Sequence, residues 1–96
     1  MSVPLYDLRL LRSYCWLKQD LKRCPTKHEF MEKRGVSSTS LNKFFKRLKD
    51  YGFFVVYPFN EDAGATVVNI YCRRPGLVKT KVIGFKILGE LVWTRN

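Results

Sequence analysis

The segment from residue 35 to residue 52 constrains the fold most, because it contains a complete helix with a signal at each end. Gly35 can adopt a positive φ and end a preceding helix, and Ser37 or Ser38 can cap the next one. The apolar side chains that follow have the i, i+3, i+4, i+7 spacing of one helical face: Leu41, Phe44, Phe45 and Leu48. The segment therefore predicts a turn, a capped amphipathic helix that Gly52 closes, and the entry into a strand.

The opposite face of this helix is polar and basic. Short polar side chains lie near its N-terminal end and cations lie further along, with Arg47 at the margin of the face. Short polar groups reach base edges, whereas cations hold phosphates, so the face resembles one that reads DNA. We predict base readout by Ser38, Thr39, Ser40, Asn42 and Lys43. We predict phosphate contacts by Lys27, Lys46, Arg47, Arg73 and Arg74. The alternative is an ordinary solvated, charged helix.

The same residues carry a resemblance to a known family. The segment is similar, without a gap, to the helix-turn-helix core of winged-helix transcriptional regulators, whose recurring pattern is G-V-S-x-x-T-V-x-R-x-L-x-x-L-x-x-x-G. Identical residues are Gly35, Val36, Ser37, Leu48 and Gly52. Conservative replacements are Ser40, Leu41, Lys43 and Phe45. The resemblance covers about residues 4–72, and it implies a winged helix-turn-helix fold that binds double-stranded DNA.

The charge of the chain agrees with a nucleic-acid partner. Eighteen Lys and Arg against eight Asp and Glu give a formal net charge of +10 over 96 residues, which is the length of one domain. Twelve of the cations lie between Arg9 and Lys49, and none lies between Asp50 and Cys72. The basic surface is therefore expected on the helical half. Basic proteins also bind membranes or RNA without specificity, which is the alternative.

Two further helices are expected before the basic one. The first spans about residues 4–23, because Pro4 suits a first turn and the Cys24-Pro25 step disfavours helical geometry. Thr26 and Glu29 have the spacing of a capping box, which predicts a short second helix that continues to Arg34.

A β-hairpin is expected after the helices. Residues 53–59 and 67–72 are β-branched and aromatic, and residues 60–65 are rich in turn formers. Pro58 predicts an edge or a bulge, since it cannot donate a ladder hydrogen bond. The hairpin corresponds to the wing, but its tip carries Glu61 and Asp62, which phosphate repels. Three alternatives stay open: the wing avoids DNA, Asn60 and backbone amides contact it, or the wing faces a protein.

The remaining segment, residues 77–93, is apolar and needs a place to bury itself. Its polar residues fall within a narrow helical angle, which favours an amphipathic helix, while Gly84, Gly89 and the Val82-Ile83 pair favour the alternative, a strand. It either packs on the first helix or forms a dimer interface. Many winged-helix regulators dimerise through terminal helices, so the resemblance implies a homodimer interface formed by Leu77, Phe85, Leu88, Leu91 and Val92. The fold is thus α+β, with a DNA-binding unit in residues 1–76 and a packing or dimerisation segment in residues 77–96 of the same domain.

Metal sites and disulfides have little support. Cys15, Cys24 and Cys72 form an odd set without C-x-x-C spacing, and His28 alone completes no zinc site. Buried thiols or a disulfide across a dimer both remain open.

Enzymatic chemistry and membrane insertion also have little support. We expect solvated or capping roles for the acidic residues of the helices: Asp7, Asp20, Glu29, Glu32 and Asp50. No glycine-rich phosphate loop is present, so neither catalysis nor a cofactor nor a small-molecule substrate is predicted. Residues 1–7 lack a leader, and Lys86 and Glu90 interrupt the last apolar stretch, so we expect a cytoplasmic protein without a membrane span.

The sequence therefore predicts a dimeric, sequence-specific DNA-binding protein that regulates transcription by occupying its site. One rival is a winged helix that binds a protein through its acidic wing and apolar tail. Another is a basic domain that binds nucleic acid without specificity. The small size and the cysteines also resemble winged-helix proteins of archaeal viruses, for which the compartment would be the host cytoplasm.

Overall fold

Three helices precede a set of antiparallel strands in the computed structural model, which describes residues 3–72, 84–87 and 90–93. The described helices are α1 (Leu5–Leu21), α2 (Lys27–Arg34) and α3 (Ser38–Asp50). The described strands are β1 (Phe53–Val56), β2 (Phe59–Asn60), β3 (Ala65–Thr66), β4 (Asn69–Cys72), β5 (Gly84–Ile87) and β6 (Glu90–Trp93). The expected α+β class, with three helices and an antiparallel hairpin, is confirmed.

The helix ends follow the local signals closely. The capping box is present: Thr26 Oγ1 accepts from the Glu29 amide at 3.1 Å, and Glu29 Oε1 accepts from the Thr26 amide at 2.8 Å. Gly35 ends α2 with a φ of 65°, and the Ser37 hydroxyl caps α3. The first helix is shorter than predicted, because Lys22 already leaves it in the left-handed conformation with a φ of 60°.

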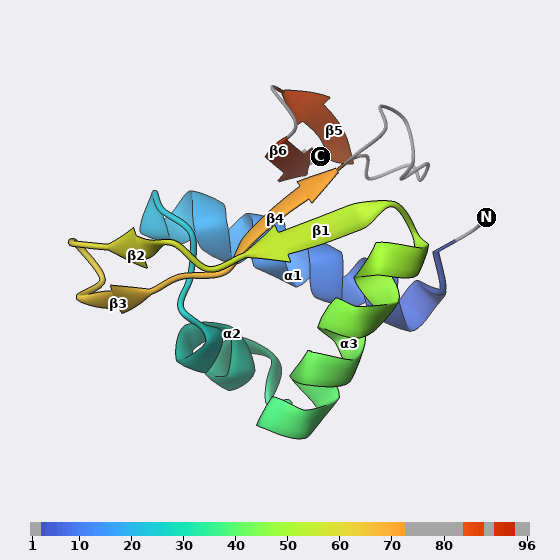
Figure 1. The fold of residues 1–96 in the computed structure, drawn as a ribbon, viewed down its shortest axis with the longest axis horizontal. Coiled ribbons are helices and arrows are strands. Elements are labelled where there is room, and N and C mark those ends of the chain that lie inside the picture. The colour runs from blue at the N-terminus through green and yellow to red at the C-terminus, as the bar shows by residue number, and fades with distance from the viewer. Residues whose placement is uncertain (1–2, 73–83, 88–89, 94–96) are drawn as a thin grey trace.

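The core lies between the helices and the face of the sheet that they cover (Figure 1). The predicted apolar face of α3 is confirmed, since all four of its residues are buried. They pack with side chains from α1, α2, β1 and β4 and from the loops just before these two strands: Leu10, Leu11, Tyr14, Cys15, Leu17, Phe30, Tyr51, Phe53, Val68 and Ile70. Burying each large apolar side chain contributes about 1.5–3 kcal/mol, so this cluster fixes how α3 sits on the rest of the fold.

The expected hairpin is divided into two parts. β1 pairs with β4, from Phe53 opposite Cys72 to Val56 opposite Asn69, and the shorter β2–β3 pair extends beyond it. The division falls at Pro58, which has no amide hydrogen but whose carbonyl accepts from the Val67 amide at 2.9 Å. The predicted edge or bulge at Pro58 thus takes the form of a break between two short ladders (Figure 1).

A buried tyrosine of α1 satisfies the backbone where the ladder is broken. The Tyr14 hydroxyl donates to the Val68 carbonyl at 2.8 Å and accepts from the Ile70 amide at 3.1 Å. The Val68 amide donates to the Pro25 carbonyl at 2.7 Å. Because a buried backbone group without a partner is costly, these three bonds hold β4 against α1 and the loop that follows it.

The C-terminal segment forms strands where the structure describes it. β6 pairs with β4, with Glu90 opposite Tyr71, and with β5, which gives the sheet order β1-β4-β6-β5. The favoured helix was therefore wrong for these residues and the strand alternative was right, because the glycines at 84 and 89 and the neighbouring β-branched residues outweigh the helical spacing. β6 also lies beside α1 of the same chain.

The predicted dimer residues are covered only in part. The structure describes the backbone of Phe85, Leu91 and Val92 within β5 and β6. Leu77 and Leu88 lie outside the described residues. The dimer interface stays a prediction.

Tyr14→Phe should lower the free energy of unfolding by about 1–3 kcal/mol, because it leaves the Val68 carbonyl and the Ile70 amide buried without their partner. Chemical denaturation measures the loss. The matched control is Tyr6→Phe, which removes a hydroxyl from a side chain that is 49% exposed. Equal stability of the two variants would contradict the role given to Tyr14.

Candidate nucleic-acid interface

The predicted readout residues share one exposed surface on α3. Its first turns project away from the sheet, and the last turn approaches β1 (Figure 1). The side chains predicted to read bases are all exposed: Ser38, Thr39, Ser40, Asn42 and Lys43. Lys46 continues this surface and is also exposed. The sequence thus predicted correctly which side of α3 faces solvent, while base readout itself stays a prediction.

The serines at the start of α3 are partly engaged in its cap. Ser37 Oγ accepts from the Ser40 amide at 3.1 Å and donates to Ser40 Oγ at the same distance. This arrangement orients the Ser40 hydroxyl toward the cap. Ser38 and Thr39 extend from the same turn, where the helix dipole favours a negatively charged group such as phosphate.

A lysine of α2 donates a hydrogen bond to an asparagine of α3. Lys27 Nζ donates to Asn42 Oδ1 at 2.8 Å, and the contact lies on the exposed side of the two helices. The bond joins a residue predicted to contact phosphate with one predicted to read a base. The bond orients the Asn42 amide in the free chain, and orientation matters because an asparagine pairs with adenine through both branches of its amide.

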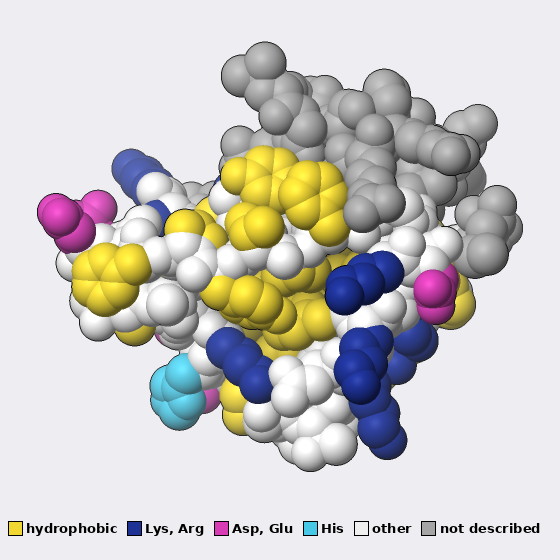
Figure 2. All heavy atoms as spheres, in the orientation of Figure 1, with side chains coloured by type: hydrophobic (Ala, Val, Ile, Leu, Met, Phe, Trp, Pro, Cys, Tyr) yellow, Lys and Arg dark blue, Asp and Glu magenta, His cyan; other side chains and the backbone are white. Residues whose placement is uncertain are grey.

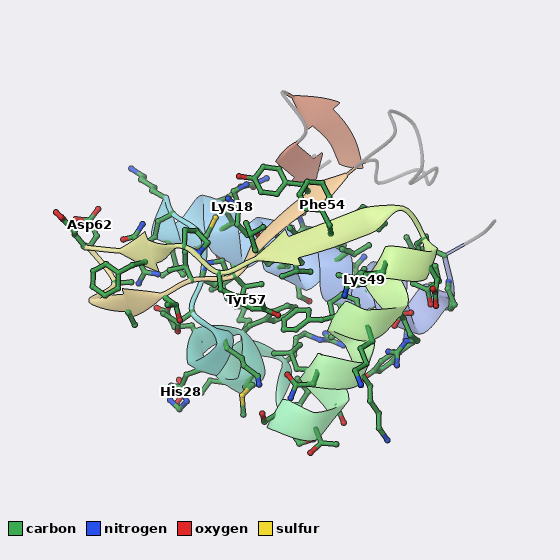
Figure 3. The ribbon with its side chains drawn as sticks, viewed as in Figure 1. Lys18, His28, Lys49, Phe54, Tyr57 and Asp62 are labelled. Carbon is green, nitrogen blue, oxygen red and sulfur yellow. The ribbon has the colours of Figure 1, made fainter. Side chains whose placement is uncertain are left out.

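A groove runs between α3 and the strand that follows it. It has a volume of about 380 Å³ and is lined by Asn42, Phe45, Lys46, Lys49, Val55 and Tyr57. Figure 2 shows hydrophobic side chains in a hollow bordered by Lys and Arg, and Figure 3 shows Lys49 and Tyr57 on its two walls. The Tyr57 and Phe45 rings meet nearly at right angles with centroids 6.2 Å apart.

Sequence reasoning missed two residues of this groove. Lys49 follows Asn42 and Lys46 at the i, i+4, i+7 spacing, which would have placed the three on one flank of α3. Tyr57 is 52% exposed, and its position just before Pro58 is the signal that it lies outside the regular ladder. Burial of part of its ring raises the pKa of the Tyr57 phenol.

The guanidinium of Arg47 is held by α1, on the other flank of α3. Arg47 Nε donates to Asp7 Oδ2 at 3.0 Å, and a terminal nitrogen donates to Asp7 Oδ1 at 2.8 Å. The Tyr51 hydroxyl donates to the same carboxylate at 2.5 Å. Arg47 also lies over the ring of Tyr6, 5.9 Å from its centroid. Two of its donors are therefore committed inside the protein, and its phosphate contact stays a prediction.

The expectation of a solvated or capping Asp7 was wrong. Only 1% of Asp7 is exposed, so burial acts to raise its pKa, but the hydrogen bonds from Arg47 and Tyr51 and the Arg47 charge outweigh burial and lower it. Glu29, by contrast, has the expected capping role. Arg23 donates to both oxygens of Glu29 at 2.9 Å, and together with the capping bond this lowers the pKa of Glu29 to about 2.

The β2–β3 pair forms the distal hairpin, and hydrogen bonds to Asn60 stabilise the turn at its tip. Asn60 Oδ1 accepts from the Ala63 amide at 3.0 Å, and the Asn60 carbonyl accepts from the Gly64 amide at 2.9 Å, where Gly64 has a φ of 65°. The Asn60 oxygen therefore stabilises the turn. Glu61 and Asp62 are exposed at this tip, as the labelled Asp62 shows in Figure 3. Arg73 and Arg74, predicted to contact phosphate, lie outside the described residues.

Cys15 and Cys24 are thiols and do not form a disulfide. Burial raises the pKa of the Cys15 thiol to about 12, while Cys24 is half-buried with its sulfur 3.8 Å from the Tyr14 hydroxyl. The His28 imidazole lies 2.9 Å from Glu32 on the surface of α2. Within the described part of the chain, no group of three or more His, Cys, Asp and Glu side chains is placed to hold a metal ion.

None of the described helices combines the length and the apolar character needed to cross a membrane.

No protein-family model, curated protein or solved structure matches the chain. What the interface binds must therefore be inferred from the charges, exposure and contacts of its own residues.

Asp7→Asn should destabilise the fold by about 1.5–3 kcal/mol at neutral pH, because it removes the charge that Arg47 and Tyr51 bind. The folded state lowers the pKa of Asp7, so the folded chain binds this proton more weakly than the unfolded chain. The stability difference between wild type and variant should be complete above about pH 4 and shrink as the pH falls further.

Urea denaturation across this pH range gives the measurement. Asp50→Asn, which neutralises an exposed carboxylate at the end of α3, is the matched control. A difference between wild type and Asp7→Asn that does not change with pH would count against the Asp7 network.

Proposed function

We propose that this chain is a winged-helix protein that binds double-stranded DNA at specific sequences and regulates transcription by occupying them. The observation that carries the proposal is the exposed face of α3, where short polar side chains precede Lys43 and Lys46 along a helix whose opposite face is buried. A helix with this arrangement fits the major groove, with its front residues at base edges and its cations near phosphates.

The elements around α3 support the proposal. α2, the turn at Gly35 and α3 have the order of a helix-turn-helix, and the antiparallel strands follow as a wing does. If α3 lies in the major groove of DNA, the Lys27–Asn42 hydrogen bond orients a base-reading residue from the neighbouring helix α2. It presents the Asn42 amide in one orientation, which lowers the cost of ordering that side chain on binding.

Two arginines of the helical half are paired with carboxylates of the protein, and three lysines of α3 are exposed to solvent. Arg23 and Arg47 form bidentate pairs with Glu29 and Asp7, so their charges are balanced within the protein. Lys43, Lys46 and Lys49 are exposed on α3. We therefore assign the phosphate contacts of the helix to Lys46 and Lys49, while Lys43 stays among the residues that read bases, and binding should weaken strongly as salt rises.

A protein-binding role is the second candidate, and the distal hairpin favours it. Phe59 is 66% exposed on β2, and Glu61 and Asp62 make the adjacent tip acidic. An apolar side chain beside acidic ones is better suited to a basic protein surface than to phosphate. In the DNA-binding reading, this hairpin stays clear of the duplex.

Binding-site selection from a random duplex library tests the proposal directly. Enrichment of one sequence, with binding that random duplexes displace poorly, supports a specific regulator. Equal binding to all duplexes would favour the non-specific basic domain, and absence of binding at low salt would favour the protein-interaction role.

Asn42→Ala should weaken binding to the selected site by about 1–3 kcal/mol and relax the base preference at one position. Lys46→Ala should instead weaken binding to all duplexes and reduce the salt slope by about 1, because phosphate contacts carry no sequence information. Titrations of selected and random duplexes at several salt concentrations separate the two effects. The readout face would be wrong if both variants kept the affinity, preference and salt slope of the wild type.

The intact chain should form a dimer whose α3 helices enter successive major grooves. The selected site should then be a near-palindrome with half-sites about 10 base pairs apart. Light scattering of the full chain, with and without reductant, measures the assembly. A monomer under both conditions would exclude the dimer, whereas a dimer lost only under reduction would indicate a disulfide between subunits, which Ser substitutions of the cysteines would locate.

A further inference from the structure

The groove between α3 and Tyr57 has an apolar, aromatic part and a basic part. A nucleotide likewise has a flat base and an anionic phosphate. The apolar part of the groove contains Phe45, Val55 and the ring of Tyr57, and the α3 wall carries Lys46 and Lys49. We propose that this groove binds one unpaired nucleotide of a DNA strand, with the base against Tyr57 and a neighbouring phosphate at the two lysines. The inference rests on the proposed function insofar as both use the same face of α3.

Tyr57 is suited to stacking because its ring is both held and accessible. The near-perpendicular contact with Phe45, at an interplanar angle of 71°, fixes the ring at one side. Phe45 itself is only 6% exposed, so this support is part of the core, while half of Tyr57 remains exposed. A supported aromatic ring beside a basic groove is the arrangement on which single-stranded nucleic acids stack their bases.

The size and charge of the groove favour a nucleotide over other occupants. A volume of about 380 Å³ lies at the low end of ligand pockets, which suits one ring system rather than a folded segment. Among the described residues, the titratable groups that line it are Lys46, Lys49 and the Tyr57 phenol, so this part of the lining contains no carboxylate to repel phosphate. Asn42 adds an amide that can hydrogen-bond a base edge.

The occupant must be unpaired, because a base inside a duplex has both faces covered by its neighbours. A frayed end, a single-stranded stretch or an opened base pair exposes such a base. Since Asn42 and Lys46 belong both to the groove and to the proposed duplex-reading face, the groove extends that face toward β1.

Fluorescence anisotropy of the full chain with two labelled strands tests the proposal. One strand is an oligothymidine of about 8 nucleotides, and the other is an abasic strand with the same number of phosphates. The wild type should bind the oligothymidine about tenfold more tightly, because only this strand can stack. Equal affinity for the two strands, with both displaced by a glutamate-rich peptide, would overturn the proposal in favour of a general anion-binding surface.

Three variants assign the effect to the groove. Tyr57→Ala should lose the preference for oligothymidine while its affinity for the abasic strand is unchanged, and Tyr57→Phe, which keeps the ring, should retain the preference. Lys49→Gln should weaken binding to both strands and reduce the salt slope by about 0.7. A Tyr57→Ala variant that keeps both its melting temperature and the preference would overturn the proposal.

The selected duplex separates this inference from the proposed function. Affinity for that duplex and preference for oligothymidine are measured independently on the wild type, because a paired site offers no base to the groove. Absence of any preferred duplex, together with a clear preference for oligothymidine, would remove the proposed function and leave the groove assignment standing. The reverse pattern would remove only the groove assignment.

Discussion

A buried carboxylate fixes the relation between the first helix and the third, and the surface of α3 depends on it. Asp7 lies in the first turn of α1, and Arg47 and Tyr51 reach it from the last turn of α3 and the residue after it. Because the charge is buried, both of its partners must be in place, which makes the geometry specific. The apolar face of α3 supplies most of the burial, but an apolar face alone allows a helix to rotate or slide. The Asp7 network anchors its C-terminal half and leaves the N-terminal turns projecting (Figure 1).

Local signals in the sequence predicted the helices well, because those signals act over three or four residues. The capping box at Thr26, the left-handed Gly35 and the cap at Ser37 depend only on nearby backbone atoms. The solvent side of α3 follows from the same periodicity. Asp7 illustrates what such reasoning misses. Its partners lie 40 and 44 residues away, so a pattern read along α1 treats it as one more polar residue on an exposed face.

The strands were harder to predict, because their geometry depends on partners far away in the chain. Pro58 indicates where the hairpin is interrupted, but the partners of Val68 at this break are Tyr14 and Pro25, and neither residue lies in the hairpin. The segment near the C-terminus has the spacing of an amphipathic helix, yet β6 finds an open edge on β4. Pairing with β4 and β5 satisfies backbone groups of β6, which outweighs a weak helical preference. The groove was missed for the same reason, since Tyr57 meets α3 only in the folded chain.

The hydrogen bond between Lys27 and Asn42 couples two properties of the surface of α3. If α3 reads DNA, one contact connects a cation that sets general affinity with an amide that sets sequence preference. A substitution at position 42 that alters the preferred base also removes the acceptor that positions the Lys27 ammonium beside α3. The base preference and the placement of a phosphate-binding cation are therefore coupled at these two positions.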